Sequence, residues 1–120
     1  MKVLIVESEA PLGEIWQRHL ERQGARVERA GDQYSAIRRL QDRQFDIIVL
    51  NLVLSTGSAL AVADFASYRW PETRVIFVTD TSFFSDGSIF QHAPNACAFV
   101  HSETPPEDLA AMVEHYATTR

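Results

Sequence analysis

Three short apolar runs of the chain end in or are followed by polar residues, namely Glu7, Ser8, Asn51 and Thr79. The types of these residues limit the chemistry that is possible there. In open α/β sheets, ligands and reacting groups gather beyond the carboxyl ends of such strands. A carboxylate at this place could attack phosphorus or hold a cation. The amide of Asn51 is neutral and its nitrogen lone pair is delocalised, so it is a poor nucleophile. The pattern therefore favours a binding module, and we expect no enzymatic activity.

Apolar runs typical of β-strands alternate with helical patterns along the whole chain. The predicted strands are Val3–Val6, Ala25–Arg29, Ile47–Leu50, Arg74–Thr79 and Ala96–Val100. The unbroken apolar run Ile47–Leu50 is typical of a central parallel strand that is covered on both faces. Strands that alternate with helices indicate an α/β fold, with a parallel sheet, right-handed crossovers and helices on both faces.

Helical periodicity predicts which side chains face the sheet. The helix that starts near Pro11 has an apolar stripe, formed by Leu12, Ile15, Trp16, His19 and Leu20. The helix that follows Gly31 and Asp32 has a shorter one, formed by Tyr34, Ile37 and Leu40. Further helices are predicted over residues 59–68, 82–92 and 107–116, the second of them weakened by Gly87.

Length and charge set the class of protein. The 120 residues suffice for one compact domain, so we expect residues 1–120 to form a single unit. The net charge of −5 disfavours nucleic acid as a ligand of this domain. Seven of the eleven basic residues lie between Arg18 and Arg43, which allows a local basic face.

The cysteine content and the N-terminus bear on location. Cys97 is the single cysteine, which excludes an internal disulfide and is compatible with a reducing cytoplasm. Together with His101 it provides too few ligands for a zinc site, and we expect neither metal nor cofactor. The first apolar run is too short for a signal peptide or a membrane span, so we expect a cytoplasmic protein.

Over nearly its full length the chain resembles a response-regulator receiver domain. Asn51 follows the acidic end of the first strand by 43 to 44 residues and takes the phosphoacceptor position, and Thr79 follows 28 residues later at the switch position. Asn95-Ala96 replaces the usual Gly-Ala before the last strand, and residues 106–109 resemble the start of the family's last helix. The resemblance implies a flavodoxin-like, doubly wound, five-stranded parallel sheet of order 2-1-3-4-5.

The residues that carry the family's chemistry are mostly replaced. Members of the family accept a phosphoryl group on an Asp, assisted by Mg²⁺, two acids, a Thr or Ser, and a Lys. Here Asn51 stands at the acceptor, and Ser8 replaces one acid while Glu7 keeps the other. Mg²⁺ prefers carboxylate oxygens in octahedral geometry, and this set offers too few of them.

The Lys of the family is also absent. Its position falls on Ser102 when counted from Asn95-Ala96 and on His101 when counted from Thr79. On the first count, Glu103 takes the position of the family's following proline, and its charge would repel a phosphoryl group. The resemblance therefore implies a degenerate receiver of a two-component or phosphorelay system.

Alternative roles remain open for several of these residues. Asn51 could mimic a fixed phosphorylation state or bind a small polar ligand, or it could only hydrogen-bond its neighbours. Thr79 could act as a switch or only cap the next turn. Glu7 and Glu9 could hold a cation weakly, or they could be solvated acids at a helix N-terminus, favoured there by its dipole.

The function implied is signal transduction through phosphorylation-independent protein–protein contacts. One alternative keeps the phosphorelay with a relocated acceptor, Asp80 or Asp86. The other is a flavodoxin-like ligand-binding domain, which would need a phosphate-binding loop after the first strand, where the chain has acids instead.

A partner surface is predicted near the C-terminal third. It comprises Phe83, Phe84, Phe90 and Phe99, in a region where the resemblance places the usual contact face of receivers. We expect a protein partner there, which could be a signalling kinase, an output domain or another regulator, or a second copy in a homodimer. The alternative is that these rings only complete the core.

Overall fold

The computed structural model describes residues 1–80 and 93–118, and its centre is a sheet of parallel strands. The strands are β1 (Lys2–Val6), β2 (Arg26–Ala30), β3 (Ile47–Asn51), β4 (Arg74–Thr79) and β5 (Ala96–His101). Their order is β2-β1-β3-β4-β5, and each neighbouring pair is parallel. The predicted α/β class and strand order are therefore confirmed.

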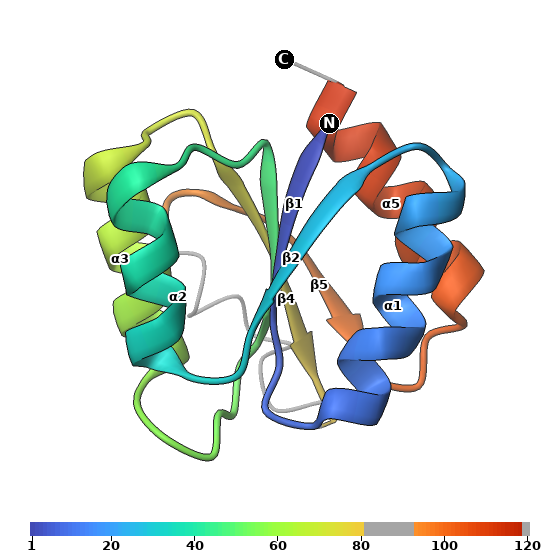
Figure 1. The fold of residues 1–120 in the computed structure, drawn as a ribbon, viewed down its shortest axis with the longest axis horizontal. Coiled ribbons are helices and arrows are strands. Elements are labelled where there is room, and N and C mark those ends of the chain that lie inside the picture. Colours follow the sequence, from blue (N-terminus) through green and yellow to red (C-terminus); the bar gives the residue numbers. More distant parts are fainter. Residues whose placement is uncertain (81–92, 119–120) are drawn as a thin grey trace.

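Helices cover both faces of the sheet (Figure 1). They are α1 (Ala10–Arg22), α2 (Gln33–Asp42), α3 (Ala59–Arg69) and α5 (Pro106–Thr118). Helices α1 and α5 lie on one face, and α2 and α3 lie on the other (Figure 1). The helix predicted over residues 82–92 lies outside the described residues. No helix in the described part of the chain is long and apolar enough to span a membrane.

The central strand β3 explains why its sequence is an unbroken apolar run. Residues 47–50 have no exposed surface. Ile48 and Leu50 belong to the core against α2 and α3, whereas Ile47 and Val49 belong to the core against α1 and α5. Side chains of a strand alternate between the two faces of a sheet, so a strand with a helical layer on each face must be apolar at every position.

Two side chains predicted to face the core are exposed instead. Ile15 is 40% exposed, because the neighbouring Trp16 is buried and successive residues of a helix point about 100° apart. Tyr34 is 63% exposed, because Ala36 is buried and lies two residues away, on the opposite side of α2. The buried side of α2 is formed by Ala36 and Leu40.

Candidate functional site

The carboxyl ends of β1, β3 and β4 meet around a cavity of about 330 Å³. The strand register pairs Val6 with Leu50 and Asn51 with Val78, so residues that follow these strands become neighbours. The cavity is lined by Glu7, Ser8, Glu9, Leu12, Asn51, Val53, Leu54, Ser55, Asp80 and Ser102. The structure thus brings together four of the predicted site residues, namely Glu7, Ser8, Asn51 and Ser102.

Asn51 and Glu7 are joined directly across the cavity. The Nδ2 of Asn51 donates a hydrogen bond of 2.6 Å to Oε1 of Glu7, and its Oδ1 accepts one of 2.9 Å from the backbone N–H of Val53. The other carboxylate oxygen of Glu7 accepts from the backbone N–H of Glu9 at 3.0 Å. Glu7 is only 7% exposed, which corrects the alternative that it is a solvated acid. Its buried charge is compensated by protein donors.

Ser8 ties three loops together through one hydroxyl. Its Oγ donates to the carbonyl of Gly31 at 2.9 Å and accepts from the backbone N–H of Ser55 at 2.9 Å. These bonds join the loop after β1 to the loops after β2 and β3. An ionised carboxylate could accept from Ser55 but could not donate to a carbonyl. Ser8 therefore serves this connection in a way that an acid could not.

The two candidates for the Lys position lie in different surroundings. Ser102 lines the cavity, and its backbone N–H donates to the carbonyl of Thr79 at 2.8 Å. His101 pairs with Thr79 in the β4–β5 register, but it is exposed, and its Nδ1 accepts from the backbone N–H of Glu103. Thr79 itself ends β4 and is 6% exposed. The residue that reaches the cavity is thus a neutral serine.

The cavity does not suit Mg²⁺. Three carboxylates line it, from Glu7, Glu9 and Asp80. Across residues 1–80 and 93–118, no three or more His, Cys, Asp or Glu side chains form a group able to hold a metal ion. Mg²⁺ needs several oxygen ligands in octahedral geometry, and both oxygens of Glu7 already accept hydrogen bonds.

The predicted aromatic surface is described only in part. Phe99 is half-buried in β5, and its ring stacks on Phe77 with centroids 5.2 Å apart and planes 13° apart. It packs against the core that α2 and α3 share with the sheet. Phe83, Phe84 and Phe90, like the alternative acceptor Asp86, lie outside the described residues.

Gln33, a residue without a predicted role, fixes the loop after β3. Its Oε1 accepts from the backbone N–H of Ser58 at 2.7 Å, and its backbone N–H donates to the carbonyl of Thr56. Between these contacts Gly57 has a φ of +87°, a conformation that favours glycine. The pair Gly57-Ser58 signals the turn and the start of α3, but no periodic pattern marks Gln33 as its partner.

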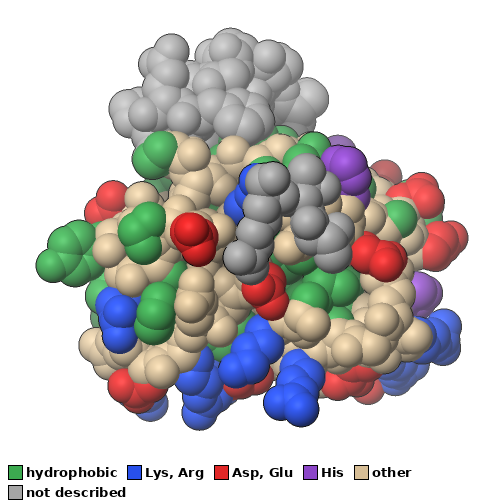
Figure 2. Space-filling view, turned by 90° about the horizontal axis from the view of Figure 1, so that it is seen from above, with side chains coloured by type: hydrophobic (Ala, Val, Ile, Leu, Met, Phe, Trp, Pro, Cys, Tyr) green, Lys and Arg blue, Asp and Glu red, His purple; other side chains and the backbone are tan. Residues whose placement is uncertain are grey.

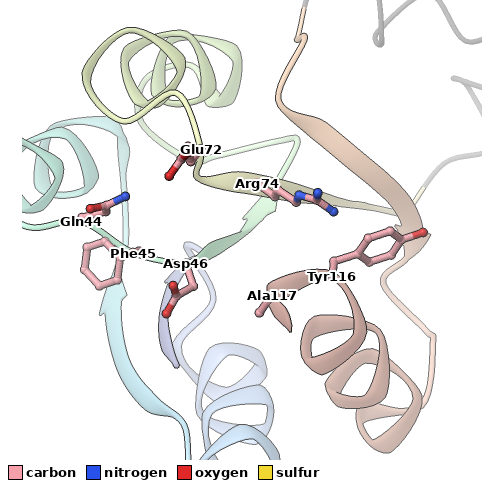
Figure 3. A pocket seen from close by; sticks show the side chains of 7 residues that line it. All are labelled: Gln44, Phe45, Asp46, Glu72, Arg74, Tyr116 and Ala117. Carbon is pink, nitrogen blue, oxygen red and sulfur yellow. The ribbon is translucent and has the colours of Figure 1, made fainter. Parts of the chain in front are cut away.

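A second hollow lies at the opposite end of the sheet, where β3 and β4 begin (Figure 3). It is lined by Gln44, Phe45, Asp46, Glu72, Arg74, Tyr116 and Ala117. Its volume is about 10 Å³, roughly enough for one water molecule, so it is not a ligand site.

The view from this end shows Lys and Arg side chains gathered along one edge of the molecule (Figure 2). Among the described residues, Arg39 and Arg43 pair with Glu28 of β2.

Comparison with known proteins identifies the family. The model of the response regulator receiver domain matches residues 3–114. A comparison with curated proteins returns no significant match. Among solved structures, the CheY-like receiver domain protein from Methanospirillum hungatei JF-1 has a TM-score of 0.88 at 19% identity, covering 97% of this chain and 92% of that one.

Two further structures show the same fold. The non-phosphorylated HemR receiver domain from Leptospira biflexa has a TM-score of 0.87 at 22% identity, covering 99% of this chain and 95% of that one. The response regulator TrrA from Thermotoga maritima, solved in complex with Mg²⁺ and BeF, has a TM-score of 0.83 at 18% identity, covering 96% and 97%. The family match over residues 3–114, on a sheet of the same order, shows that this chain belongs to the response regulator receiver domain family.

Proposed function

We propose that this receiver domain, acting as a single unit over residues 1–120, transmits signals through protein–protein contacts that do not depend on phosphorylation. The observation that carries the proposal is the hydrogen bond from Asn51 to Glu7 at the acceptor position. A receiver that is switched by phosphate needs an anionic oxygen there and a metal beside it. In this chain the amide of Asn51 stands there, and it donates a hydrogen bond to the neighbouring carboxylate of Glu7.

Several residue replacements at this site each disfavour phosphorylation. The amide of Asn51 cannot form a stable acyl phosphate, Ser8 supplies no charge to a metal, and Ser102 supplies no cation to a phosphoryl oxygen. Each missing charge-assisted hydrogen bond would cost about 1.5–3 kcal/mol of phosphoryl stabilisation. The carboxylates of Glu9 and Asp80, which line the same cavity, would repel the phosphoryl group.

The partner of this domain is a protein. The partner is a signalling kinase, an output domain or another regulator in the cytoplasm, and the domain itself performs no catalysis. One contact surface is the face that includes β5 and α5, through which a homodimer could also form. The ring of Phe99 packs on the α2 and α3 side of the sheet, so it would contribute to that face only at the edge formed by β5.

Intact-mass measurement tests the proposal. The protein is incubated with acetyl phosphate and Mg²⁺, beside a receiver that retains its acceptor Asp as the positive control for the reagent. We expect no mass increase for this chain and one phosphoryl group on the control. A phosphoryl adduct on this chain would overturn the proposal.

A relocated acceptor is the second candidate function, and the position of Asp80 supports this residue as the acceptor. Asp80 is exposed and lines the same cavity as Glu7 and Glu9. If an adduct forms, peptide mapping of Asp80→Asn beside the unchanged chain would locate it. Loss of the adduct in Asp80→Asn would establish this second function.

A further inference from the structure

An apolar groove of about 410 Å³ runs along the loop between β3 and α3. Its walls include Leu52, Val53, Leu54 and Leu60. Val53 is 68% exposed and Leu60 is 38% exposed, whereas Leu52 and Leu54 also pack against or near the core. Exposed aliphatic side chains that line a hollow are typical of a binding site.

Hydrogen bonds hold the loop that carries this groove at several points. The backbone N–H of Leu52 donates to the carbonyl of Val78, and that of Val53 donates to Oδ1 of Asn51. Ser8 and Gln33 hold the rest of the loop through Ser55 and Ser58. A partner that binds a loop already ordered avoids the entropic cost of ordering it.

The groove continues into the cavity of the degenerate site, because Val53 and Leu54 line both. The three side-chain carboxylates of that cavity have no counterpart of opposite sign there: none of the described lining residues is Lys, Arg or His. Glu9 and Asp80 are exposed to solvent at its rim. The apolar groove thus ends in an acidic hollow that would favour a cationic group.

We infer that this groove docks a protein segment that presents a Lys or Arg side chain beside aliphatic side chains. The aliphatic groups lie against Val53 and Leu60, and the cation lies in the acidic hollow. Nucleic acid and phosphate carry the wrong charge for the hollow. The inference rests on the proposed function, since a phosphorylated site would not leave this hollow for a partner.

Phage display of a random dodecapeptide library tests the inference, with the whole chain as bait. The matched variants are Val53→Ser in the groove and Tyr68→Ser on α3, where Tyr68 is 85% exposed and lines neither hollow. We expect enriched peptides with a basic residue next to aliphatic ones. Val53→Ser should weaken binding of a synthesised winner about tenfold, as for one buried aliphatic side chain, and Tyr68→Ser should leave it unchanged.

The charge is tested with the same peptide. Replacement of its basic residue by Glu should abolish binding, and Glu9→Gln should weaken it. Lack of enrichment, enrichment of acidic peptides, or equal effects of Val53→Ser and Tyr68→Ser would each overturn the inference. So would sedimentation that shows a dimer lost in Val53→Ser, because the occupant would then be a second copy. The proposed function fails separately, through a phosphoryl adduct.

Discussion

The amide nitrogen of Asn51 lies 2.6 Å from a carboxylate oxygen of Glu7 and donates a hydrogen bond to it. The bond joins the carboxyl ends of β3 and β1 at the centre of the sheet. In a receiver with two carboxylates at these positions, a metal ion would have to offset their repulsion. Here the amide donates a hydrogen bond to Glu7, so the two side chains attract each other in place of that repulsion.

Asn51→Asp should therefore destabilise the protein. The new carboxylate would face Glu7 in place of a donor, at a cost of about 1–3 kcal/mol in the free energy of unfolding at neutral pH. Urea denaturation measures the change. Mg²⁺ should restore part of the loss in this variant and have no effect on the unchanged chain. Asn95→Asp, whose Nδ2 donates to the carbonyl of Ala63 away from Glu7, provides the control that Mg²⁺ should not rescue.

Ser8→Ala should loosen the loop after β3 without adding a charge. Removal of the hydroxyl breaks its bonds to Gly31 and Ser55 and should cost about 0.5–1.5 kcal/mol of stability. Hydrogen exchange at the Ser55 amide should quicken. Ser102→Ala is the matched control, since the Ser102 side chain lines the same cavity and no hydrogen bond of it is found within the described residues. Equal protection of Ser55 in both variants would count against a tie through Ser8.

Gly57→Ala should be more costly than Gly24→Ala. Both glycines have a positive φ, +87° and +90°, so each substitution carries about 1–2 kcal/mol of backbone strain. A Cβ at Gly57 would also lie 2.4 Å from Cβ of Gln33, whereas nothing lies within 4 Å at Gly24. Thermal unfolding of the two variants should thus separate the clash from the strain. Equal melting temperatures would show that the side chain of Gln33 moves aside without loss of stability.

Acid should weaken the start of α2. Asp32 accepts hydrogen bonds from the backbone and hydroxyl of Ser35, and these bonds lower the pKa of its carboxyl below the ordinary 3.8. A lowered pKa means that the stabilisation is complete above 3.8 and is lost as the pH falls through the lower, folded value. Asp32→Asn retains a capping oxygen but does not titrate. Its stability should therefore fall less steeply than that of the unchanged chain in this acid range.

Cys97 should react slowly with alkylating reagents. Burial raises the pKa of its thiol from 9.0 to about 11, and its Sγ donates to the carbonyl of Val75. Since the thiolate is the nucleophile, iodoacetamide at pH 8 should label the folded protein far more slowly than the unfolded one. Because the folded pKa is raised, the protein should lose stability as the pH rises from 9.0 towards 11. Equal labelling rates in the folded and unfolded chains would contradict this.

The sequence allowed the fold to be predicted because its signals are local and repeated. The fully buried run of β3 and the alternation of strands and helices determine the architecture, and the structure confirms them. The exposed Ile15 and Tyr34 were wrongly placed, since an apolar type alone does not determine the phase of a helix stripe. The buried neighbours Trp16 and Ala36 determine it.

The site was less predictable because it depends on contacts between loops. Spacing could bring Glu7, Ser8 and Asn51 to one end of the sheet, but it could not show which atoms bond. It also gave two positions for the missing Lys, and the cavity contains Ser102. The role of Gln33 and the exposure of Val53 have no signal in the sequence, because both follow from the path of a single loop.

We expect the pocket at Asn51 to need neither phosphate nor metal. Two-dimensional NMR of the ¹⁵N-labelled protein, titrated with Mg²⁺ and beryllium trifluoride as the phosphoryl mimic, tests it most directly. The backbone amides of Glu9, Val53 and Ser55 donate hydrogen bonds to side chains that line the pocket, so they report on its state. We predict that their resonances do not move beyond the effect of ionic strength. Saturable shifts at these amides would show that the pocket binds the metal or the phosphoryl mimic, against this expectation.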